Sequence, residues 1–337
     1  MVLGLALAAG GCRGSEASTE AAAVVARADL ASSASASSRA RFVVDPRRLR
    51  EDVERLSDDR LRGRPTPSPE LDEAAAYLVQ RFAELGLEPL AGAPDHRQRF
   101  ECGGDAHPGP ASNVLALLPG RDPAVADQLV MVSAHYDHVG ERPGGEDSIY
   151  NGANDDASGV AAMLAIAELL AASPPRRSVL LVAFCGEERG LLGSTHYAAH
   201  PLLPLDRVVA QVNLEMLGRP DPDAPGLAWI TGMERSELGE WLAAANVGTE
   251  LRFVDAMEIG PVEGGAFERS DNYPLALQGV VAHSVSTGRL DALYHSPDDE
   301  ADTLDYEGMA VLVEGIARGV HHLGEAQGQP GWIDPPE

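Results

Sequence analysis

Histidine and carboxylate residues stand at the ends of several apolar segments of this sequence. Residues 128–134 lead into His135, with Asp137 two residues further on, and a later apolar run is followed by Glu187 and Glu188. A His with a nearby Asp is typical of a metal ligand whose imidazole is oriented by a carboxylate. Adjacent Glu side chains repel each other unless a cation lies beside them, so this pair indicates one metal ligand and one general acid or base.

Further acidic and His positions share this placement. Residues 151–159 form a loop rich in Gly and Asn that leads into a helical run and contains Asp155 and Asp156. Asp156 is equally well explained as a helix N-cap, which the helix dipole favours. Glu215 follows an apolar run among apolar neighbours, and a buried carboxylate needs a partner. His295 lies in acidic surroundings before the last helical segment.

Apart from Asp137, which would orient His135, and Asp156, which would cap the helix, these positions offer two His and four carboxylates. That is one Glu more than the five ligands of two zinc ions that share a bridging carboxylate. Imidazole and carboxylate suit zinc, and pairs of metal ions recur in hydrolases. Simpler explanations exist for each pattern taken alone. The His-x-Asp triplet is also found in plain polar loops, and Glu187 and Glu188 would form an exposed pair if Arg189 were their counter-ion.

Short apolar runs alternate with helical runs from about residue 113 onward. This alternation predicts an α/β fold with a central, largely parallel sheet covered on both faces, whose functional groups lie at the carboxyl ends of the strands. Strands are expected at residues 113–119, 128–135, 178–186, 208–217, 227–232 and 280–286. Helices are expected at residues 47–56, 69–85, 159–172, 191–200, 235–245 and 306–323.

Composition excludes several classes of function. The 337 residues include 52 acidic and 26 basic side chains, for a formal charge of −26, so nucleic acid is not an expected partner. Every basic residue is Arg, which excludes a P-loop lysine, a pyridoxal Schiff base and a lysine nucleophile. The sequence also has no G-x-S-x-G motif, which disfavours a serine hydrolase.

The chain divides into four predicted regions. Residues 1–12 resemble the end of a signal peptide, and AGGC resembles a bacterial lipoprotein processing site with Cys12 as the lipidated residue. This predicts export, either as a periplasmic or outer-surface lipoprotein of the cell envelope or as a secreted protein. An Ala/Ser-rich flexible linker at 13–40, one domain at 41–328 and a tail at 329–337 follow. Cys102 and Cys185 form either a disulfide or two buried free thiols.

Six motifs carry a resemblance to a known family. HYDHVG, NGANDDASGVA, FCGEERGLLGS, VNLEMLGR, RSDNYPLALQG and YHSPDDEADTL resemble the zinc aminopeptidase family, which also includes glutamate carboxypeptidase-like metallopeptidases. The resemblance extends from about Leu56 to about Leu304 and keeps the order of the motifs. It implies a three-layer α/β/α sandwich around a mixed, largely parallel sheet. The roughly 25 residues between the second helix and residue 113 leave no room for the extra domain of the carboxypeptidase-like relatives.

The resemblance also implies a di-zinc site. In it, His135 and Glu215 hold one Zn²⁺, Glu188 and His295 hold the other, and Asp155 bridges the two ions. The peptide bond between Asp155 and Asp156 is implied to be cis. Many members have Asp where this chain has Glu215, whose longer arm keeps a ligand in place. The resemblance further implies these roles: Glu187 as the general base toward the bridging water, Asp137 as the support of His135, Tyr294 as an oxyanion donor, and Arg269, Ser270 and Asp271 on the substrate side.

The expected activity is hydrolysis of the N-terminal peptide bond of peptides with a free N-terminus. Membrane contact is expected only through a lipid anchor on Cys12, and the oligomeric state is left open. Two alternatives keep the fold: a single-zinc glutaminyl cyclase, and a non-catalytic binding homologue. The complete ligand set favours the peptidase over both.

Overall fold

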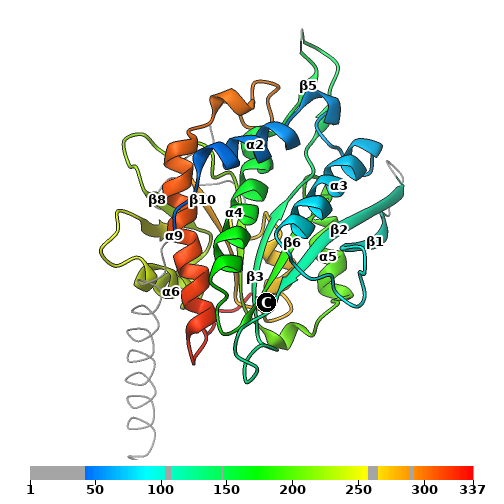
Figure 1. Cartoon of the computed structure of the whole chain (residues 1–337). Helices are drawn as coiled ribbons and strands as arrows, with labels where there is room; N and C mark the ends of the chain where they lie inside the picture. Colours follow the sequence, from blue (N-terminus) through cyan, green and yellow to red (C-terminus); the bar gives the residue numbers. More distant parts are fainter. Residues whose placement is uncertain (1–41, 103–107, 146, 257–264, 289–291, 337) are drawn as a thin grey trace, which may run out of the picture.

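An eight-stranded mixed sheet forms the centre of the computed structural model (Figure 1). The structure describes residues 42–102, 108–145, 147–256, 265–288 and 292–336. The strand order is β1-β2-β6-β3-β7-β10-β8-β9, in which β6, β3, β7 and β10 run parallel. The pairs β1–β2, β2–β6 and β10–β8 are antiparallel. The predicted mixed α/β sheet is therefore confirmed.

The strands that carry the site are the ones that were predicted. The bounds are β1 (Arg97–Cys102), β2 (Gly109–Leu118), β3 (Leu129–His135), β4 (Gly140–Glu141), β5 (Ile149–Tyr150), β6 (Ser178–Phe184), β7 (Val208–Leu214), β8 (Leu227–Ile230), β9 (Arg252–Asp255) and β10 (Ala282–Thr287). Strands β1 and β9 were not predicted. They are the two edge strands of the sheet and are partly exposed, so they lack the continuous apolar run of a buried strand.

Helices cover both faces of the sheet. Their bounds are α2 (Pro46–Leu56), α3 (Pro69–Glu84), α4 (Gly159–Ala172), α5 (Leu192–Ala199), α6 (Leu238–Ala245), α8 (Asn272–Ala276) and α9 (Tyr306–Glu325). Asp45 and Ser68 cap α2 and α3 by accepting backbone N–H groups of the first turn, and a Pro opens each helix. In Figure 1, α2, α4 and α9 lie together on one side of the strands, and α5 lies on the opposite side, near β2 and β6.

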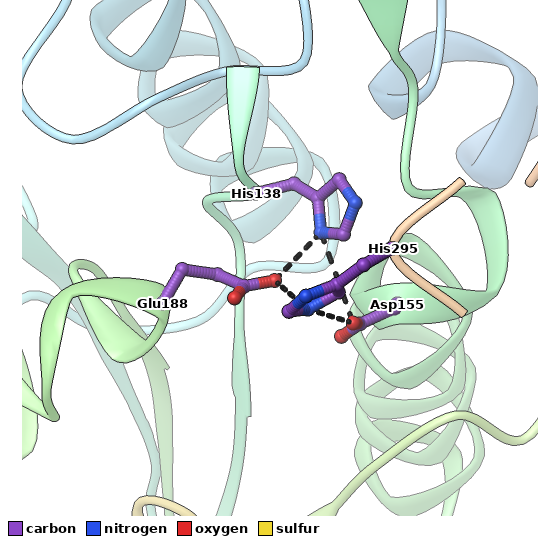
Figure 2. Close-up of side chains that lie close together, drawn as sticks. All are labelled: His138, Asp155, Glu188 and His295. Atoms are coloured by element: carbon purple, nitrogen blue, oxygen red, sulfur yellow. Dashed lines mark ion pairs between the residues drawn. The ribbon is translucent and has the colours of Figure 1, made fainter. Parts of the chain in front are cut away.

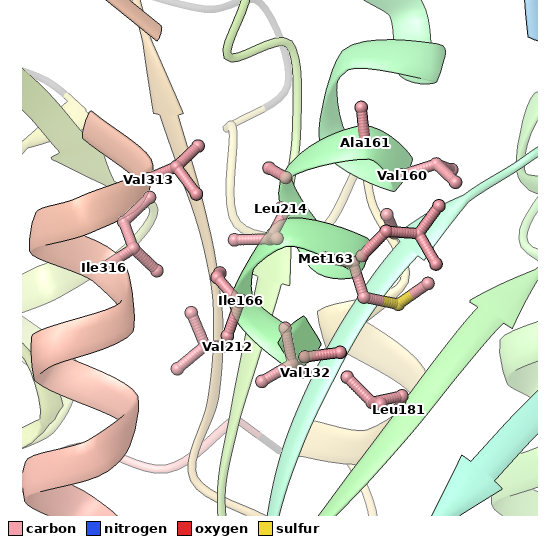
Figure 3. Close-up of a cluster of buried hydrophobic side chains, with 14 of the residues drawn as sticks. Val132, Val160, Ala161, Met163, Ile166, Leu181, Val212, Leu214, Val313 and Ile316 are labelled. Atoms are coloured by element: carbon pink, nitrogen blue, oxygen red, sulfur yellow. The ribbon is translucent and has the colours of Figure 1, made fainter. Parts of the chain in front are cut away.

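Alternate side chains of each central strand enter two separate cores. On the α4 side, Val132, Leu181 and Val212 pack with Ile166 and Val313 in the larger cluster (Figure 3). The intervening residues, such as Met131 and Val182, face the smaller cluster under α5 and α8. Helix α4 is apolar around most of its surface because it lies between α2, α9 and the sheet. Burial on both faces fixes the strands and therefore the loops that follow them.

The carboxyl ends of three neighbouring parallel strands meet at one edge of the sheet. His135 is the last residue of β3, Glu187 follows shortly after β6, and Glu215 directly follows β7. Ser133 pairs with Asn213, so His135 and Glu215 lie at the same level of adjacent strands. This register places His135 and Glu215 together without any contribution from the loops.

The structure describes the two ends of the chain to different extents. The predicted signal segment with Cys12 and the linker lie outside the described residues. The predicted tail packs on the domain over its described part: the indole of Trp332 donates to the carbonyl of Gly279 and lies against His283. Cys102 and Cys185 are free and buried. Among the helices of the described residues, none has the length and apolarity needed to cross a membrane.

Candidate metal centre

The first half of the site is built on the strands themselves. His135 Nε2 lies 3.1 Å from Asp155 Oδ1 and 3.6 Å from Glu215 Oε2, and all three side chains are buried. On its other nitrogen, His135 bonds to the backbone carbonyl of Asp137 at 3.1 Å, with the Asp137 carboxylate at 3.6 Å. The predicted support of His135 by Asp137 thus runs mainly through the main chain.

Hydrogen bonds from neighbouring strands hold Glu215 in place. Its Oε1 accepts from the Ser270 hydroxyl and, at 3.2 Å, from Asn213 Nδ2. Asn213 in turn accepts from Ser133 Oγ at 2.7 Å and donates to Ser284 Oγ at 3.0 Å. One Glu215 oxygen is therefore saturated by the protein, and the other faces His135. Nothing in the sequence pattern predicted this network, because its members come from β3, β7, β10 and the segment before α8.

The second half of the site is built mainly on loops. Figure 2 shows His138, Asp155, Glu188 and His295 converging from separate segments. Glu188 Oε1 lies 2.8 Å from His138 Nδ1 and 3.0 Å from His295 Nε2, and Asp155 Oδ2 lies 3.2 Å from His295 Nε2. Asp155 therefore turns one oxygen to each half of the site. His295 has a left-handed φ of 51° and is 27% exposed, which makes it the most accessible member of the group.

Two buried Asp side chains position the Asp155 loop. Asp299 accepts the backbone N–H groups of Asn154 and Asp155 at 3.0–3.1 Å. Asp156, joined to Asp155 by a cis peptide bond, accepts the backbone N–H groups of Gly159 and Met216, both at 3.0 Å. The N-cap explanation of Asp156 is thus borne out at Gly159, and the same carboxylate also ties this loop to the one after β7.

Buried opposite charges shift the pKa values of the site. Burial by itself would raise the pKa of Glu188, but the imidazoles of His138 and His295 outweigh it and hold that pKa at about 2. Burial opposes protonation of His295 as well, yet Asp155 and Glu188 raise its pKa to about 9. Without a metal ion, protonated imidazoles would supply the positive charge that this cluster requires.

Glu187 lies beside both groups but belongs to neither. Burial raises the pKa of its carboxyl well above the ordinary value, and the charge of Glu215 adds to this effect. Its backbone N–H donates to Asp137 Oδ1 at 3.3 Å, which links the turn after β6 to the loop after β3. A carboxylate with a raised pKa at the edge of a cation site is suited to accept a proton and release it again.

Comparison with known proteins identifies the fold family. The model of peptidase family M28 matches residues 113–320. The chain belongs to peptidase family M28. All six described residues that the resemblance assigned to the metal ions and the general base lie inside the matched range, and the predicted family of zinc-dependent aminopeptidases is confirmed.

Individual M28 relatives are distant in sequence. Aminopeptidase YwaD of Bacillus subtilis is 27% identical over 208 residues, which are 60% of this chain and 42% of that protein, so the match spans less than half of the relative. The structure of BSAP, a zinc aminopeptidase from the same species, superimposes with a TM-score of 0.68 at 16% identity, over 85% of this chain and 96% of that one. A Bacteroides thetaiotaomicron glutaminyl cyclase gives a TM-score of 0.61 at 15% identity, over 83% and 98%. These structures show a shared fold.

The remaining predicted residues of this M28 site, Tyr294, Arg269 and Asp271, differ in their burial and contacts. The ring of Tyr294 stacks on His295, with centroids 4.0 Å apart. Arg269 is exposed and near enough to Tyr294 to influence its pKa. Asp271 is fully buried, accepts from Ser194 Oγ, and has a pKa raised by burial to about 7. Its burial favours a role in orienting its neighbours over the predicted contact with substrate.

Three residues of the site were missed or discounted in the sequence. His138 and Asp299 stood only within the quoted motifs HYDHVG and YHSPDDEADTL and were given no role. Arg64 is fully buried, and its guanidinium donates to the backbone carbonyls of Tyr136 and Gly152 at 2.9 Å. It thereby holds together the two loops that carry His135 and Asp155. The Asp-Asp pair in YHSPDDEADTL was the available clue to Asp299, whereas a lone Arg gives no clue to a buried position.

Proposed function

We propose that this chain is a di-zinc aminopeptidase that hydrolyses the N-terminal peptide bond of peptides. The observation that carries the proposal is the division of Asp155: Oδ1 belongs to the group with His135 and Glu215, and Oδ2 to the group with Glu188 and His295. A carboxylate that offers one oxygen to each of two ligand groups is suited to bridge two ions. Membership of family M28 supports the same chemistry.

The ligand atoms have spacings that suit zinc. Atoms bound at about 2.0–2.1 Å around a tetrahedral ion lie roughly 3.3 Å from one another. The distances from His135 Nε2 to Asp155 Oδ1 and Glu215 Oε2 are 3.1 and 3.6 Å, and the distances from His295 Nε2 to Asp155 Oδ2 and Glu188 Oε1 are 3.2 and 3.0 Å. Neutral imidazole and ionised carboxylate are also ligand types that zinc accepts.

The protein groups have distinct tasks in the hydrolysis. Bound zinc would polarise the scissile carbonyl and make water acidic enough to ionise near neutral pH. Glu187 accepts the proton of the attacking water and delivers it to the leaving amine, a transfer favoured by its raised pKa. Tyr294 donates from its phenol to the developing oxyanion, since burial raises the pKa of that hydroxyl and keeps it protonated.

The negative charge of the molecule favours the free amino end of a peptide as the group that enters. The chain has 52 acidic and 26 basic side chains and a formal net charge of −26. An ammonium group is attracted to such a field, whereas an internal peptide bond has no charge to offer. A lipid anchor on Cys12, or secretion after cleavage of residues 1–12, would place this activity outside the cytoplasm.

One experiment tests the assignment of ions and base together. Zinc content and hydrolysis of aminoacyl-p-nitroanilides are measured on the full chain and on Glu187→Gln, which keeps the size of the side chain but cannot accept a proton. The expected result is two zinc ions per chain in both proteins, with kcat/KM reduced roughly 1,000-fold or more in the variant. Absence of bound metal in the wild type would overturn the proposal.

A separate assay distinguishes the cyclase alternative. Peptides with an N-terminal Gln are offered to the wild type, and both ammonia and free amino acids are measured. Release of ammonia without amino acids would favour a glutaminyl cyclase, which shares the fold, whereas release of amino acids supports the peptidase.

A further inference from the structure

His138 places a third imidazole in the metal centre, beside the two that the resemblance assigned. It directly follows the His135–Asp137 triplet, yet its ring belongs to the other half of the site, where it packs edge-on against the His295 ring with centroids 5.4 Å apart. The residue is 1% exposed. Its Nδ1 lies 2.8 Å from Glu188 Oε1 and 3.8 Å from Asp155 Oδ2 (Figure 2).

The polar atoms around this point are buried without hydrogen bonds. His138 Nδ1, Glu188 Oε1 and His295 Nε2 have no hydrogen-bond partner among the described residues, although Glu188 Oε1 lies only 2.8 Å from His138 Nδ1 and 3.0 Å from His295 Nε2. Buried polar groups in folded proteins are almost always satisfied, so several unsatisfied atoms facing one another indicate a missing shared partner.

The spacing of these atoms fits one four-coordinate cation. The four measured separations among His138 Nδ1, Asp155 Oδ2, Glu188 Oε1 and His295 Nε2 are 2.8, 3.0, 3.2 and 3.8 Å. The edge of a tetrahedral zinc site is roughly 3.3 Å. We propose that His138 is a fourth protein ligand, through Nδ1, of the ion held by Glu188 and His295. This inference rests on the proposed di-zinc function and makes the two ions unequal.

The two halves of the centre would then have different coordination. Three protein atoms converge in the group of His135, Asp155 and Glu215, whereas four converge around Glu188. Sites with four protein ligands are closed and bind firmly, and sites with three leave a position for water or substrate. The ion at Glu188 therefore binds first and is released last, and the ion at Glu215 offers the open position for the substrate.

The surrounding backbone fixes the His138 ring in this position. Gly152 has a φ of +58°, and a Cβ there would lie 2.4 Å from His138 Cγ, so the ring occupies the space of a missing side chain. The buried Arg64 accepts the His138 N–H on its backbone carbonyl at 3.4 Å and donates to the Gly152 carbonyl. The imidazole is thus held by packing before any ion binds, as expected of a preorganised ligand.

The first test counts imidazoles directly. Zinc X-ray absorption on the full chain loaded with two zinc ions reports the average number of imidazole ligands. With His138 bound, three imidazoles are shared by two ions, and without it two imidazoles are shared by two ions. His138→Asn retains an amide near the position of Nδ1 that can hydrogen-bond to Glu188 but removes an imidazole, so its spectrum is expected to show two for two ions.

The second test measures affinity. Zinc is titrated in competition with a chelator into the metal-free wild type, His138→Asn and the control His200→Ala, an exposed residue that directly follows α5. Replacing residues that only orient metal ligands weakens binding about 10–100-fold, so loss of a ligand is expected to weaken the tighter of the two sites by roughly 100-fold or more. The control is expected to bind both ions as the wild type does.

The outcomes separate this inference from the proposed function. A wild type with two bound zinc ions, two imidazoles and unchanged affinities in His138→Asn would overturn the role of His138 and leave the di-zinc peptidase intact. A wild type that binds no zinc would overturn both. If His138→Asn fails to fold, the imidazole count of the wild type alone decides the matter.

Discussion

Two buried histidines on strands of the same sheet, separated by β7, have opposite proton affinities. His135 ends β3 and His283 lies within β10, and both are essentially inaccessible to solvent. Burial opposes protonation of His135, but Glu215 and the Asp side chains around it raise its pKa well above the ordinary value. Burial lowers the pKa of His283 to about 4, and within the described part of the chain its ring is hydrogen-bonded to Thr231 and Ser236 and to no carboxylate.

The hydrogen bonds of His283 explain why it is structural. Its Nδ1 lies 2.6 Å from the carbonyl of Thr231, which can only accept, so Nδ1 carries the proton. Its Nε2 then accepts from Ser236 Oγ at 2.7 Å. The rings of Phe267 and Trp332 lie against it, each with a centroid separation of 5.3 Å. A neutral imidazole satisfies every partner here, whereas His135 faces carboxylates that only a cation satisfies. The surroundings, and not burial as such, decide which buried His can serve a metal ion.

Replacing the two histidines should separate these roles most clearly. His135→Ala removes a predicted metal ligand, and kcat/KM for aminoacyl-p-nitroanilides is expected to fall roughly 1,000-fold or more together with loss of bound zinc. His283→Gln is expected to retain both ions and to keep kcat/KM within about threefold, while its melting temperature falls. A similar loss of activity in the two variants would erase the contrast.

Removing the metal should lower the stability of the chain through the metal centre around His295 and leave the surroundings of His283 unchanged. Chelation is expected to destabilise the chain by roughly 4 kcal/mol relative to zinc at about 1,000 times its Kd. His295 has a pKa raised to about 9 in the absence of metal, so its stabilising contribution is complete below its unfolded value of 6.5 and is lost as the pH rises through 9. Thermal denaturation should therefore show the metal-free chain losing stability between pH 6.5 and 9, with a flatter curve for the zinc-bound chain.

The His283 pocket should respond to acid instead. The unfolded imidazole, with a pKa near 6.5, takes a proton before the folded one at about 4, so stability falls as the pH drops between these values. The corresponding free energy is about 3 kcal/mol at the acid end of this range. Urea unfolding of the wild type and His283→Gln, with zinc bound, should show their difference in stability shrinking by this amount toward pH 4. A constant difference would contradict a neutral His283.

A smaller effect is expected one step away from the metal. Ser270→Ala removes the hydroxyl that donates to Glu215 Oε1 and accepts from Asn213 Nδ2. The carboxylate stays in place but is less well oriented, and zinc affinity at that half of the centre should fall about 10–100-fold. Ser236→Ala, the equivalent change beside His283, should leave zinc affinity unchanged when both are titrated against a chelator.

The buried elements were predictable because their patterns are local. Residues 159–172 were expected to be helical, and α4 has those bounds. The strands that end near His135, Glu187 and Glu215 were expected because apolar runs of six or seven residues bounded by polar loops have few other solutions. The edge strand β1, which is mostly polar, and the short helix α8 gave no such pattern.

The sequence by itself determined the family, the layered fold and the set of His and carboxylate residues at the strand ends, because these depend on residue type and order. The tertiary structure alone decided that His138 faces Glu188 while His283 faces Thr231 and Ser236, that Arg64 is buried between two loops, and that residues 329–336 pack on the domain. These outcomes depend on which segments, distant in sequence, surround a side chain. The proton and metal affinity of an imidazole follows from that surrounding charge, which no local pattern contains.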